Sequence, residues 1–482
     1  MNKIIAAFTV TGSLTLAASA DPALTIYNHS FAVVRDTVPL DLKAGPNPLH
    51  YTGATAQVEP DSVILRDPAG KHSLQILEQN YRNDPVSEAL LLSLNEGQTI
   101  DFEKLRMKDN TKIRELIPGK IVRSGYVPGG EAQSPIIEVG GKLQFSLPGT
   151  PLFPDLGSDT LLKPAFNWLL QSDTSGKFDA EVGYVTGGFD WSASYNLVSP
   201  EKGDIVDLVG WITMKNESGK TFENARIKLL AGDVNKIQPP PMTTLGGVRP
   251  RAMAMKAAYE AAPAVTEKAF DEFHLYSIAR PTTLHDRETK QVEFVHAEKM
   301  LAPTIYVYDG AVGYRFYGLN LDQGWGQTDN KKILVQREFK NAETNQLGIA
   351  LPKGKLRFYR RDSDGQLQFV GENEIDHTPR NETVRVTTGN AFDLVGERKA
   401  TNFRTDSAEK WIDETFEIKL RNRKHDAPVE IRVVEHLYRW SNWEIKAKSD
   451  EFTKKDAQTI EFRIPVKPDE ERTVTYTVHY SW

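Results

Sequence analysis

The sequence predicts a mainly β protein made of several antiparallel β-sandwich domains, and three stretches of alternating side chains predict it. Every second residue is apolar along 189–197, and the same alternation returns along 206–214. The end of the chain, 474–482, alternates in the same way. A period of two is typical of strands with one buried and one solvent-facing side. Because such runs recur between turn residues, we expect antiparallel sandwiches.

Length and composition set the scale. The chain has 482 residues, of which 39% are hydrophobic and 26% charged, as in folded globular proteins. At roughly 150 residues per domain, about three domains are expected. The net charge of −6 disfavours a general role with nucleic acids, and the absence of cysteine excludes disulfides, thiolate metal sites and cysteine nucleophiles.

The first twenty residues have the composition of an export signal. Lys3 supplies a positive charge, residues 4–18 are apolar or small, and Ala18-Ser19-Ala20 forms an A-x-A cleavage site. We therefore expect a signal peptide over 1–20, cleaved near Ala20, and a secreted or periplasmic mature protein. No later stretch is long and apolar enough to form a membrane-spanning helix, so an integral helical membrane protein is not expected.

The first half of the mature chain is expected to hold two parts. Residues 21–70 contain N-terminal strands, and residues 71–150 contain short strands separated by glycines, typical of a small SH3-like barrel. Within this unit Ser87 is the expected N-cap of a short helix that ends at Leu94. Gly140-Gly141 is expected to form a two-residue hairpin turn.

The rest of the chain is expected to form two sandwiches. Residues 151–350 are expected to form a β-sandwich that is interrupted by the proline-rich loop 238–264. A short helix with Pro164 in its first turn is expected near the start of this range. Residues 351–482 show the strand and turn spacing of an immunoglobulin-like sandwich. Within it, Asp362-Ser363-Asp364-Gly365 lacks the distal glutamate of a calcium loop and is expected to be a hairpin turn.

Several separated strings resemble a known family. They are 187–195 (GGFDWSASY), 216–225, 229–235, 281–290 and 435–443 (EHLYRWSNW). Together these strings resemble a family of exported bacterial proteins with a domain of unknown function, which also forms the C-terminal half of mucoidy-inhibitor-like proteins. The resemblance implies a β-rich exported protein and brings no activity, cofactor or catalytic residue. The mucoidy-inhibitor relatives usually add an N-terminal coiled coil, and no sustained heptad pattern occurs in this sequence.

Motifs for catalysis and metal binding are missing from the sequence. No two of the ten histidines lie three to five residues apart, and neither HExxH nor GxSxG occurs. His274, His285 and His296 lie eleven residues apart, a spacing that individually hydrogen-bonded histidines also produce. We therefore expect no metal and no cofactor, and the sequence favours a protein that is not an enzyme.

Aromatic side chains are the candidate binding residues. Trp440 and Trp443 accompany Arg439 at the end of a strand, and Trp325 lies between two glycines. Clusters of this type bind sugars, peptides or proteins when they are exposed, and they serve as core packing when they are buried. Trp325, Arg439, Trp440 and Trp443 are thus the predicted binding site.

These observations predict an exported envelope protein with a non-catalytic binding or structural role. Its expected partner is an envelope protein or polysaccharide. Two alternatives remain open. One is an envelope hydrolase whose site is assembled from non-sequential residues. The other is an outer-membrane β-barrel, suggested by the aromatic last strand that ends in Trp482.

Overall fold

The chain folds as a mainly β protein, with 62% of residues in strands and 3% in helices. The computed structural model describes residues 21–83, 86–108, 111–127, 130, 133–156, 161–232, 234–236, 265–326 and 330–482. Within them it confirms the predicted multi-domain arrangement of antiparallel sheets. The expected signal peptide 1–20 and the loop 238–264 lie outside the described residues.

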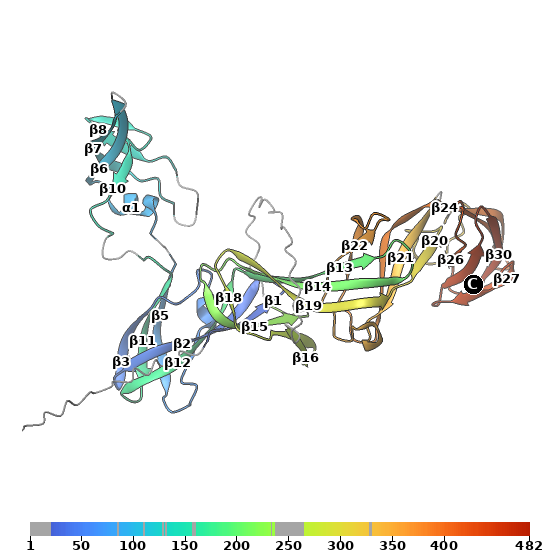
Figure 1. Cartoon of the computed structure of the whole chain (residues 1–482), viewed down its shortest axis with the longest axis horizontal. Helices are drawn as coiled ribbons and strands as arrows, with labels where there is room; N and C mark the ends of the chain where they lie inside the picture. Colours follow the sequence, from blue (N-terminus) through green and yellow to red (C-terminus); the bar gives the residue numbers. More distant parts are fainter. Residues whose placement is uncertain are drawn as a thin grey trace, which may run out of the picture. The chain divides into compact units, whose positions relative to one another are not determined.

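Two compact units make up the chain, and each draws on several stretches of sequence (Figure 1). The first unit comprises Met1–Asp190, Lys215–Ile227 and Pro281–Glu288. The second comprises Trp191–Met214, Lys228–Arg280 and Thr289–Trp482.

The first unit contains one long sheet and one three-stranded sheet. The long sheet is built on β1 (Ala23–Tyr27), β2 (Phe31–Leu42), β12 (Gly176–Gly187), β4 (Ile64–Arg66) and the first half of β15 (Phe222–Ala231), which also pairs with β18 (Thr282–Leu284). The three-stranded sheet has the order β3 (Gly45–Tyr51), β11 (Ala165–Ser172) and β5 (Leu74–Arg82). A 3-10 turn, η1, covers Pro60–Ser62.

Strand β11 replaces the short helix expected around Pro164, so that prediction is wrong. Phe166, Trp168 and Leu170 alternate on the buried side of β11, and its backbone pairs with β3 on one edge and β5 on the other. Pro164 favours the first turn of a helix, but two partner strands satisfy the backbone along the segment 165–172, and tertiary pairing decides its structure.

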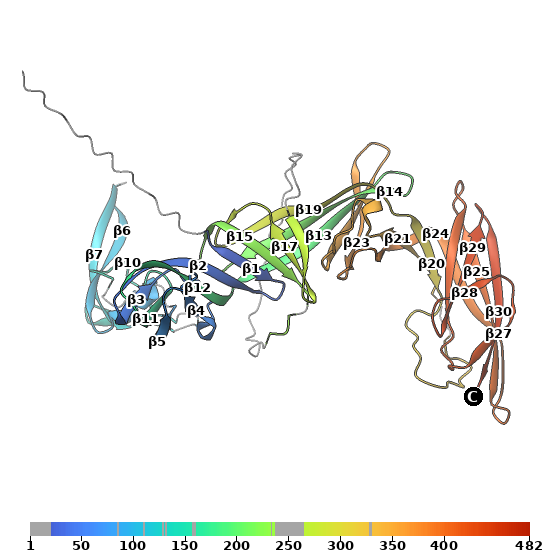
Figure 2. The same ribbon diagram turned by 90° about the horizontal axis from the view of Figure 1, so that it is seen from below.

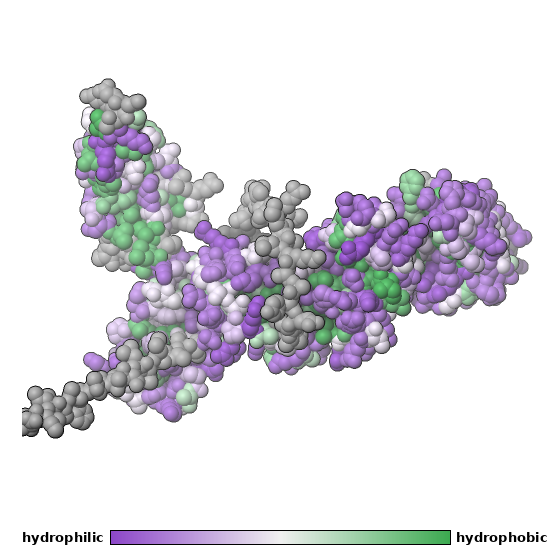
Figure 3. Space-filling view, viewed as in Figure 1, coloured by the Kyte–Doolittle hydropathy of each residue, from purple (hydrophilic) through white to green (hydrophobic). Residues whose placement is uncertain are grey.

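A five-stranded sheet completes the first unit. Its order is β10 (Thr150–Leu152), β6 (Thr99–Lys108), β7 (Thr111–Arg123), β8 (Ile136–Val139) and β9 (Lys142–Gln144). The sheet is open, so the expected closure into an SH3-like barrel is not observed. Apolar residues lie on the visible surface of this part (Figure 3), and Leu105, Met107, Leu116 and Leu143 are among its exposed side chains.

Two local predictions for this region are confirmed. Helix α1 (Glu88–Leu94) begins after Ser87, whose side-chain oxygen accepts a hydrogen bond from the Leu90 amide at 3.1 Å. Gly140 and Gly141 connect β8 to β9 with φ of 58° and 76°, the left-handed pair that a two-residue hairpin turn requires.

The second unit begins with a five-stranded sheet. Its order is β19 (Glu288–Leu301), β14 (Ile205–Asn216), β13 (Phe189–Ser199), β22 (Gly354–Arg361) and β23 (Leu367–Ile375). The predicted alternation in β13 is confirmed, because Trp191, Ala193, Tyr195 and Leu197 are all buried. Strand β16 (Val265–Phe270) pairs with β17 (Phe273–Ile278), and β17 pairs with the second half of β15.

Strands β13 and β22 are distant in sequence and pair with each other in parallel. A side chain at Gly354 would meet the Ala193 carbonyl oxygen at 2.3 Å, so only glycine permits this close approach. The Tyr195 hydroxyl donates to the Pro352 carbonyl at 2.6 Å and the Trp191 indole to the Leu230 carbonyl at 3.3 Å. Both rings therefore pack the core with their polar ends satisfied.

The C-terminal part is a sandwich formed by one nine-stranded sheet (Figure 2). The strand order is β27 (Trp443–Lys448), β30 (Glu471–Ser481), β25 (Trp411–Asn422), β24 (Thr383–Asp406), β21 (Lys332–Lys340), β20 (Thr304–Asp309), β26 (Val429–His436), β29 (Thr459–Val466) and β28 (Phe452–Lys454). A 3-10 turn, η2, covers Glu343–Asn345.

This sheet folds back on itself to enclose a core. Strands β29 and β30 are far apart in the strand order, yet the ring centroids of Phe462 and Tyr476 lie 5.7 Å apart. The alternating residues of β25 and β30, such as Ile418 and Val474, are buried in the same core, as the sequence predicts. Asp362 and Gly365 form the expected hairpin turn between β22 and β23.

Candidate functional site

The structure brings Trp325 and Arg439, two of the four predicted binding residues, together at one end of the C-terminal sandwich. The Arg439 guanidinium carbon lies 5.5 Å from the Trp325 ring centroid, and both residues line a cavity of about 10 Å³. Trp440 packs at 6.4 Å from the Phe316 ring. Trp443 donates from its indole to the Ala457 carbonyl at 2.9 Å. All three tryptophans are half-buried.

Arg439 is buried, with 1% of its surface exposed, and its charge is balanced by the buried carboxylate of Glu414. Nε and Nη2 of Arg439 donate to the two Glu414 oxygens at 2.7 and 2.8 Å, a bidentate pair. The remaining donors reach three backbone carbonyls, at Asn320, Asp322 and Trp325. All five guanidinium donors are thereby directed at the chain itself, so Arg439 acts in this structure as a positioning residue.

A second buried arginine supports the same segment. Arg398 forms an ion pair with Glu435 at 2.8 Å and donates to the Gly326 carbonyl at 2.9 Å. Its guanidinium carbon lies 3.7 Å from the Phe416 ring centroid, and the Tyr476 hydroxyl hydrogen-bonds Glu435. Burial is the largest single influence and opposes the charge on Arg398, but Glu435 and Tyr476 together outweigh burial and raise the pKa of Arg398, which stays charged.

These two arginines bond to backbone carbonyls between residues 320 and 326, the last part of the segment 310–326, which we call the aromatic loop. Within it, Asn320 Oδ1 accepts from the Asp322 amide and Asp322 Oδ1 accepts from the Gly324 amide, both at 2.9 Å. The Tyr314 ring meets the Trp325 ring edge-on at 5.4 Å. The loop nevertheless exposes large apolar side chains, namely Val312, Phe316, Tyr317 and Leu321. Tyr317 is 88% exposed. The aromatic loop therefore has its last part, 320–326, held by hydrogen bonds, and it presents apolar groups to solvent.

His436 lies beside the two ion pairs. Its Nε2 is 2.9 Å from Asp309 Oδ2, and its ring stacks on Tyr438 at 4.9 Å. Burial would lower the pKa of His436, but the hydrogen bond and charge of Asp309, helped by the charge of Glu435, outweigh it and raise the pKa above 6.5. The protonated form of His436 therefore stabilises the folded state.

The sequence contains a pattern that indicates the buried charges. Glu414 occupies an inward position of β25, in the alternation that continues with Phe416 and Ile418. Glu435 likewise follows Ile431 and Val433 on the inward side of β26. A charged residue at a position that alternation assigns to the core indicates a buried ion pair. The partners, however, lie 25 and 37 residues away along the chain, and no local pattern identifies them.

The described residues contain no group of three or more histidine, aspartate or glutamate side chains placed to hold a metal ion. Among the described residues, no helix has the length and apolar character needed to cross a membrane. No protein-family model and no curated protein matches the sequence.

Proposed function

We propose that the protein is an exported, non-catalytic binding protein whose C-terminal sandwich engages a protein of the cell envelope through the aromatic loop. The observation that carries the proposal is that two buried arginines hold residues 320–326 of the loop while the loop exposes apolar side chains to solvent. Export, and membership of the exported family that the sequence strings resemble, belong to the same proposal.

Preorganisation is the physical argument for binding. A partner that docks on a loop already fixed by hydrogen bonds does not have to order it, so more of the contact energy remains as affinity. Aromatic side chains such as Phe316 and Tyr317 supply large contact area with few rotatable bonds. The arginines of two buried ion pairs donate to the carbonyls of this one irregular segment. A loop that only connected two strands would not need this support.

The aromatic loop favours a protein partner over a polysaccharide. Val312 and Leu321 are exposed beside the aromatic rings and offer no hydrogen bonds to sugar hydroxyls. A mixture of aliphatic and aromatic groups is typical of the apolar centre of a protein interface. The neighbouring charged groups Arg398, Glu414, Glu435 and Arg439 are engaged with one another, which also favours binding over hydrolysis.

Crosslinking and pull-down from envelope extract test this proposal. The mature protein is compared with Tyr317→Ser and with Phe145→Ser, a matched control that removes an exposed aromatic ring outside the loop. We expect one identified protein to be retained by wild type and by the control. Its affinity, remeasured with the purified partner, should fall about tenfold or more in Tyr317→Ser.

Two outcomes would contradict the proposal. Equal retention by Tyr317→Ser and wild type would show that the loop is not the interface. A glycan array in which wild type binds a polysaccharide and Tyr317→Ser does not would keep the loop as the site but replace the protein partner by a polysaccharide.

A further inference from the structure

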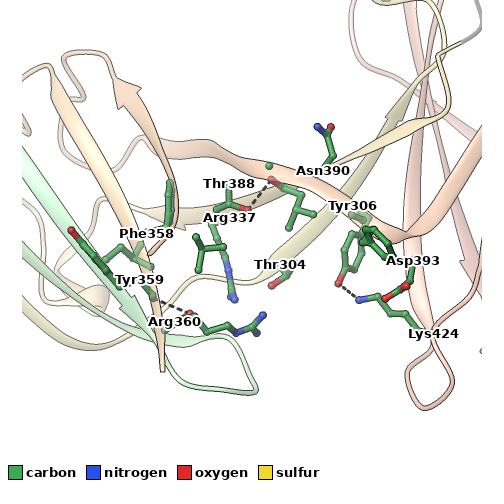
Figure 4. A pocket seen from close by; sticks show the side chains of 17 residues that line it. Thr304, Tyr306, Arg337, Phe358, Tyr359, Arg360, Thr388, Asn390, Asp393 and Lys424 are labelled. Carbon is green, nitrogen blue, oxygen red and sulfur yellow. Dashed lines mark hydrogen bonds between the residues drawn. The ribbon is translucent and has the colours of Figure 1, made fainter. Parts of the chain in front are cut away.

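A pocket of about 280 Å³ lies within the second unit, apart from the aromatic loop (Figure 4). Phe358, Tyr359 and Arg360 of β22 lie on one side, and Tyr306, Asp393 and Lys424 lie on the other. Arg337 of β21 lies between them, with Thr304 of β20 and Thr388 of β24. Ligand pockets for drug-sized molecules start near roughly 300 Å³, so this volume fits a small ligand.

The charged groups of the pocket are mostly positive. Arg337, Arg360 and Lys424 line it, and the carboxylate among its lining residues is Asp393. Arg337 has 7% of its side chain exposed and pairs with Asp204, which is half exposed, at 3.3 Å. Neither Arg360 nor Lys424 has a carboxylate within 4.0 Å among the residues that the structure describes. The pocket therefore holds an excess of positive charge.

Burial and like charge both act on Arg337. Burial lowers the pKa of Arg337 and the positive charge of Arg360 lowers it further, while Asp204 opposes the change. Within the described chain the guanidinium hydrogen bonds of Arg337 leave from Nη1 alone, to Asp204 and to the Ala302 carbonyl. Donors thus remain on Arg337, and an anion placed against Arg337 and Arg360 would relieve their repulsion.

Several uncharged polar side chains line the pocket, and some of them are engaged with the chain itself. The Thr388 hydroxyl donates to the Val335 carbonyl at 3.2 Å and the Ser199 hydroxyl to the Tyr359 carbonyl at 3.3 Å. Lys424 donates to the Tyr306 hydroxyl at 2.8 Å, which leaves the Tyr306 hydrogen as a donor toward a ligand. Together with the cations, these donors suit an anionic group.

Thr304 and Asn390 also line the pocket, and six of its lining side chains are apolar. They are Leu197, Val335, Phe358, Val370, Ala391 and Phe392. Phe392, which is 97% exposed, and Val370, which is 48% exposed, give the pocket an apolar rim open to solvent. An apolar ligand body could cover both and remove their surface from water.

We infer that this pocket binds a small carboxylate with an apolar body, about the size of an N-acylated amino acid. The carboxylate is held by Arg337 and Arg360, and the apolar body packs on Phe358 and under Phe392. The planar arginine fork matches the two oxygens of a carboxylate. The chemistry is the same for a free acid and for the C-terminal residue of a peptide.

Isothermal titration calorimetry on the mature chain tests the site. The probe is N-acetylphenylalanine, with N-acetylphenylalanine amide as a neutral molecule of the same body. We expect the acid to bind with a dissociation constant of about 1 mM or tighter and the amide to bind at least about tenfold more weakly. A hexapeptide ending in phenylalanine separates the two sources, because tighter binding than the free acid assigns a chain terminus and weaker binding assigns a small molecule.

Matched variants locate the binding. Arg360→Gln should weaken the acid about tenfold or more, whereas Arg357→Gln, on the same strand but outside the pocket lining, should leave it unchanged. Arg360 is exposed, so its replacement should not unfold the protein, and unchanged thermal unfolding checks this. Equal binding of acid and amide, equal loss in both variants, or no binding of either acid up to about 10 mM would overturn the inference. Phosphate that binds as tightly as the acid would overturn the apolar part.

The two proposals fail separately. Tyr317→Ser changes the aromatic loop and should leave titration of the acid unchanged, since Tyr317 does not line the pocket. Arg360→Gln should leave capture of the envelope protein unchanged for the same reason.

Discussion

The C-terminal sandwich and the five-stranded sheet of the first unit handle charge in opposite ways. In the sandwich, the side chains of Arg398 and Glu435 are 4% and 0% exposed and pair inside a large core. In the five-stranded sheet, Arg114 pairs with Glu103 on the surface, with 72% and 18% of their side chains exposed. The difference follows from the amount of apolar surface that each sheet can enclose.

The core of the five-stranded sheet is small within the described residues. Its buried members are Leu92, Ile100, Phe102, Ile121 and Ile137. An open sheet with one covered face leaves its other apolar side chains in water, as Leu105 and Met107 are. A sheet that folds over itself instead surrounds its interior, and there arginine and glutamate can bond to each other and to backbone carbonyls. Buried charge is therefore a property of the sandwich.

The largest effect should come from breaking a buried ion pair. Arg439→Met leaves the Glu414 carboxylate without its cation and three loop carbonyls without their donor. We expect the free energy of unfolding of the sandwich to fall by about 3–5 kcal/mol. Urea unfolding followed by tryptophan fluorescence measures it, and hydrogen exchange should show loss of protection in the aromatic loop.

The double variant Arg439→Met/Glu414→Met is the control for this prediction. It removes both charges, so most of the lost stability should return while the loop carbonyls stay unpaired. A loss below about 1 kcal/mol in Arg439→Met would show that Glu414 tolerates burial alone, and the proposed contrast between the two sheets would fail.

The two sheets should also respond to pH in opposite directions. The pKa of His436 in the sandwich is raised above 6.5, so its contribution is fully present below its unfolded pKa and is lost as pH rises through the folded pKa. The pKa of Glu96, beside the five-stranded sheet, is lowered below 4.5 by the side-chain hydrogen bond from Ser124 and by the Ser124 amide. Its contribution is present above its unfolded pKa and is lost as pH falls.

The difference in stability between wild type and each variant, measured over pH, tests these two pH ranges. The stability gap between wild type and His436→Asn should shrink as pH rises from about 6 to 9, and the gap for Glu96→Gln should shrink as pH falls below about 4.5. Hydrogen exchange resolved by sheet separates the two signals. Both effects should be smaller than that of Arg439→Met, because each removes a single hydrogen-bonded partner. Gaps that move in the same direction would contradict the assignment of either group.

The sequence was sufficient where alternation and turn chemistry acted locally. The strands around Tyr195 and Tyr476, the cap at Ser87 and the turn at Gly140 follow from spacing alone. The helix expected near Pro164 was wrong because β11 pairs with two strands that are distant in sequence. A local period carries no information about pairing between distant segments. The observed pairing therefore overrides the structure that the local pattern predicts.

The candidate site shows the same division. Trp325 and Arg439 were selected for residue type, and the structure places them together, yet the environment gives Arg439 a supporting role. Its carboxylate partner lies on another strand, and alternation shows only that Glu414 faces inward. An exposed group such as Tyr317 could not be distinguished from core aromatics, because a single ring in an irregular segment has no period to compare with.

The smallest effect is expected at the surface pair of the five-stranded sheet. Arg114 donates from Nε to Glu103 at 2.7 Å, in a geometry as regular as that between Arg439 and Glu414. Because water solvates Arg114 on most sides, Arg114→Gln leaves Glu103 partly solvated and should not change the unfolding midpoint measurably, least of all in salt. Urea unfolding at low and high salt measures it, with Lys104→Gln as a control for loss of one positive charge. If Arg114→Gln destabilised its sheet as much as Arg439→Met destabilises the sandwich, pair geometry rather than burial would decide the strength of these ion pairs.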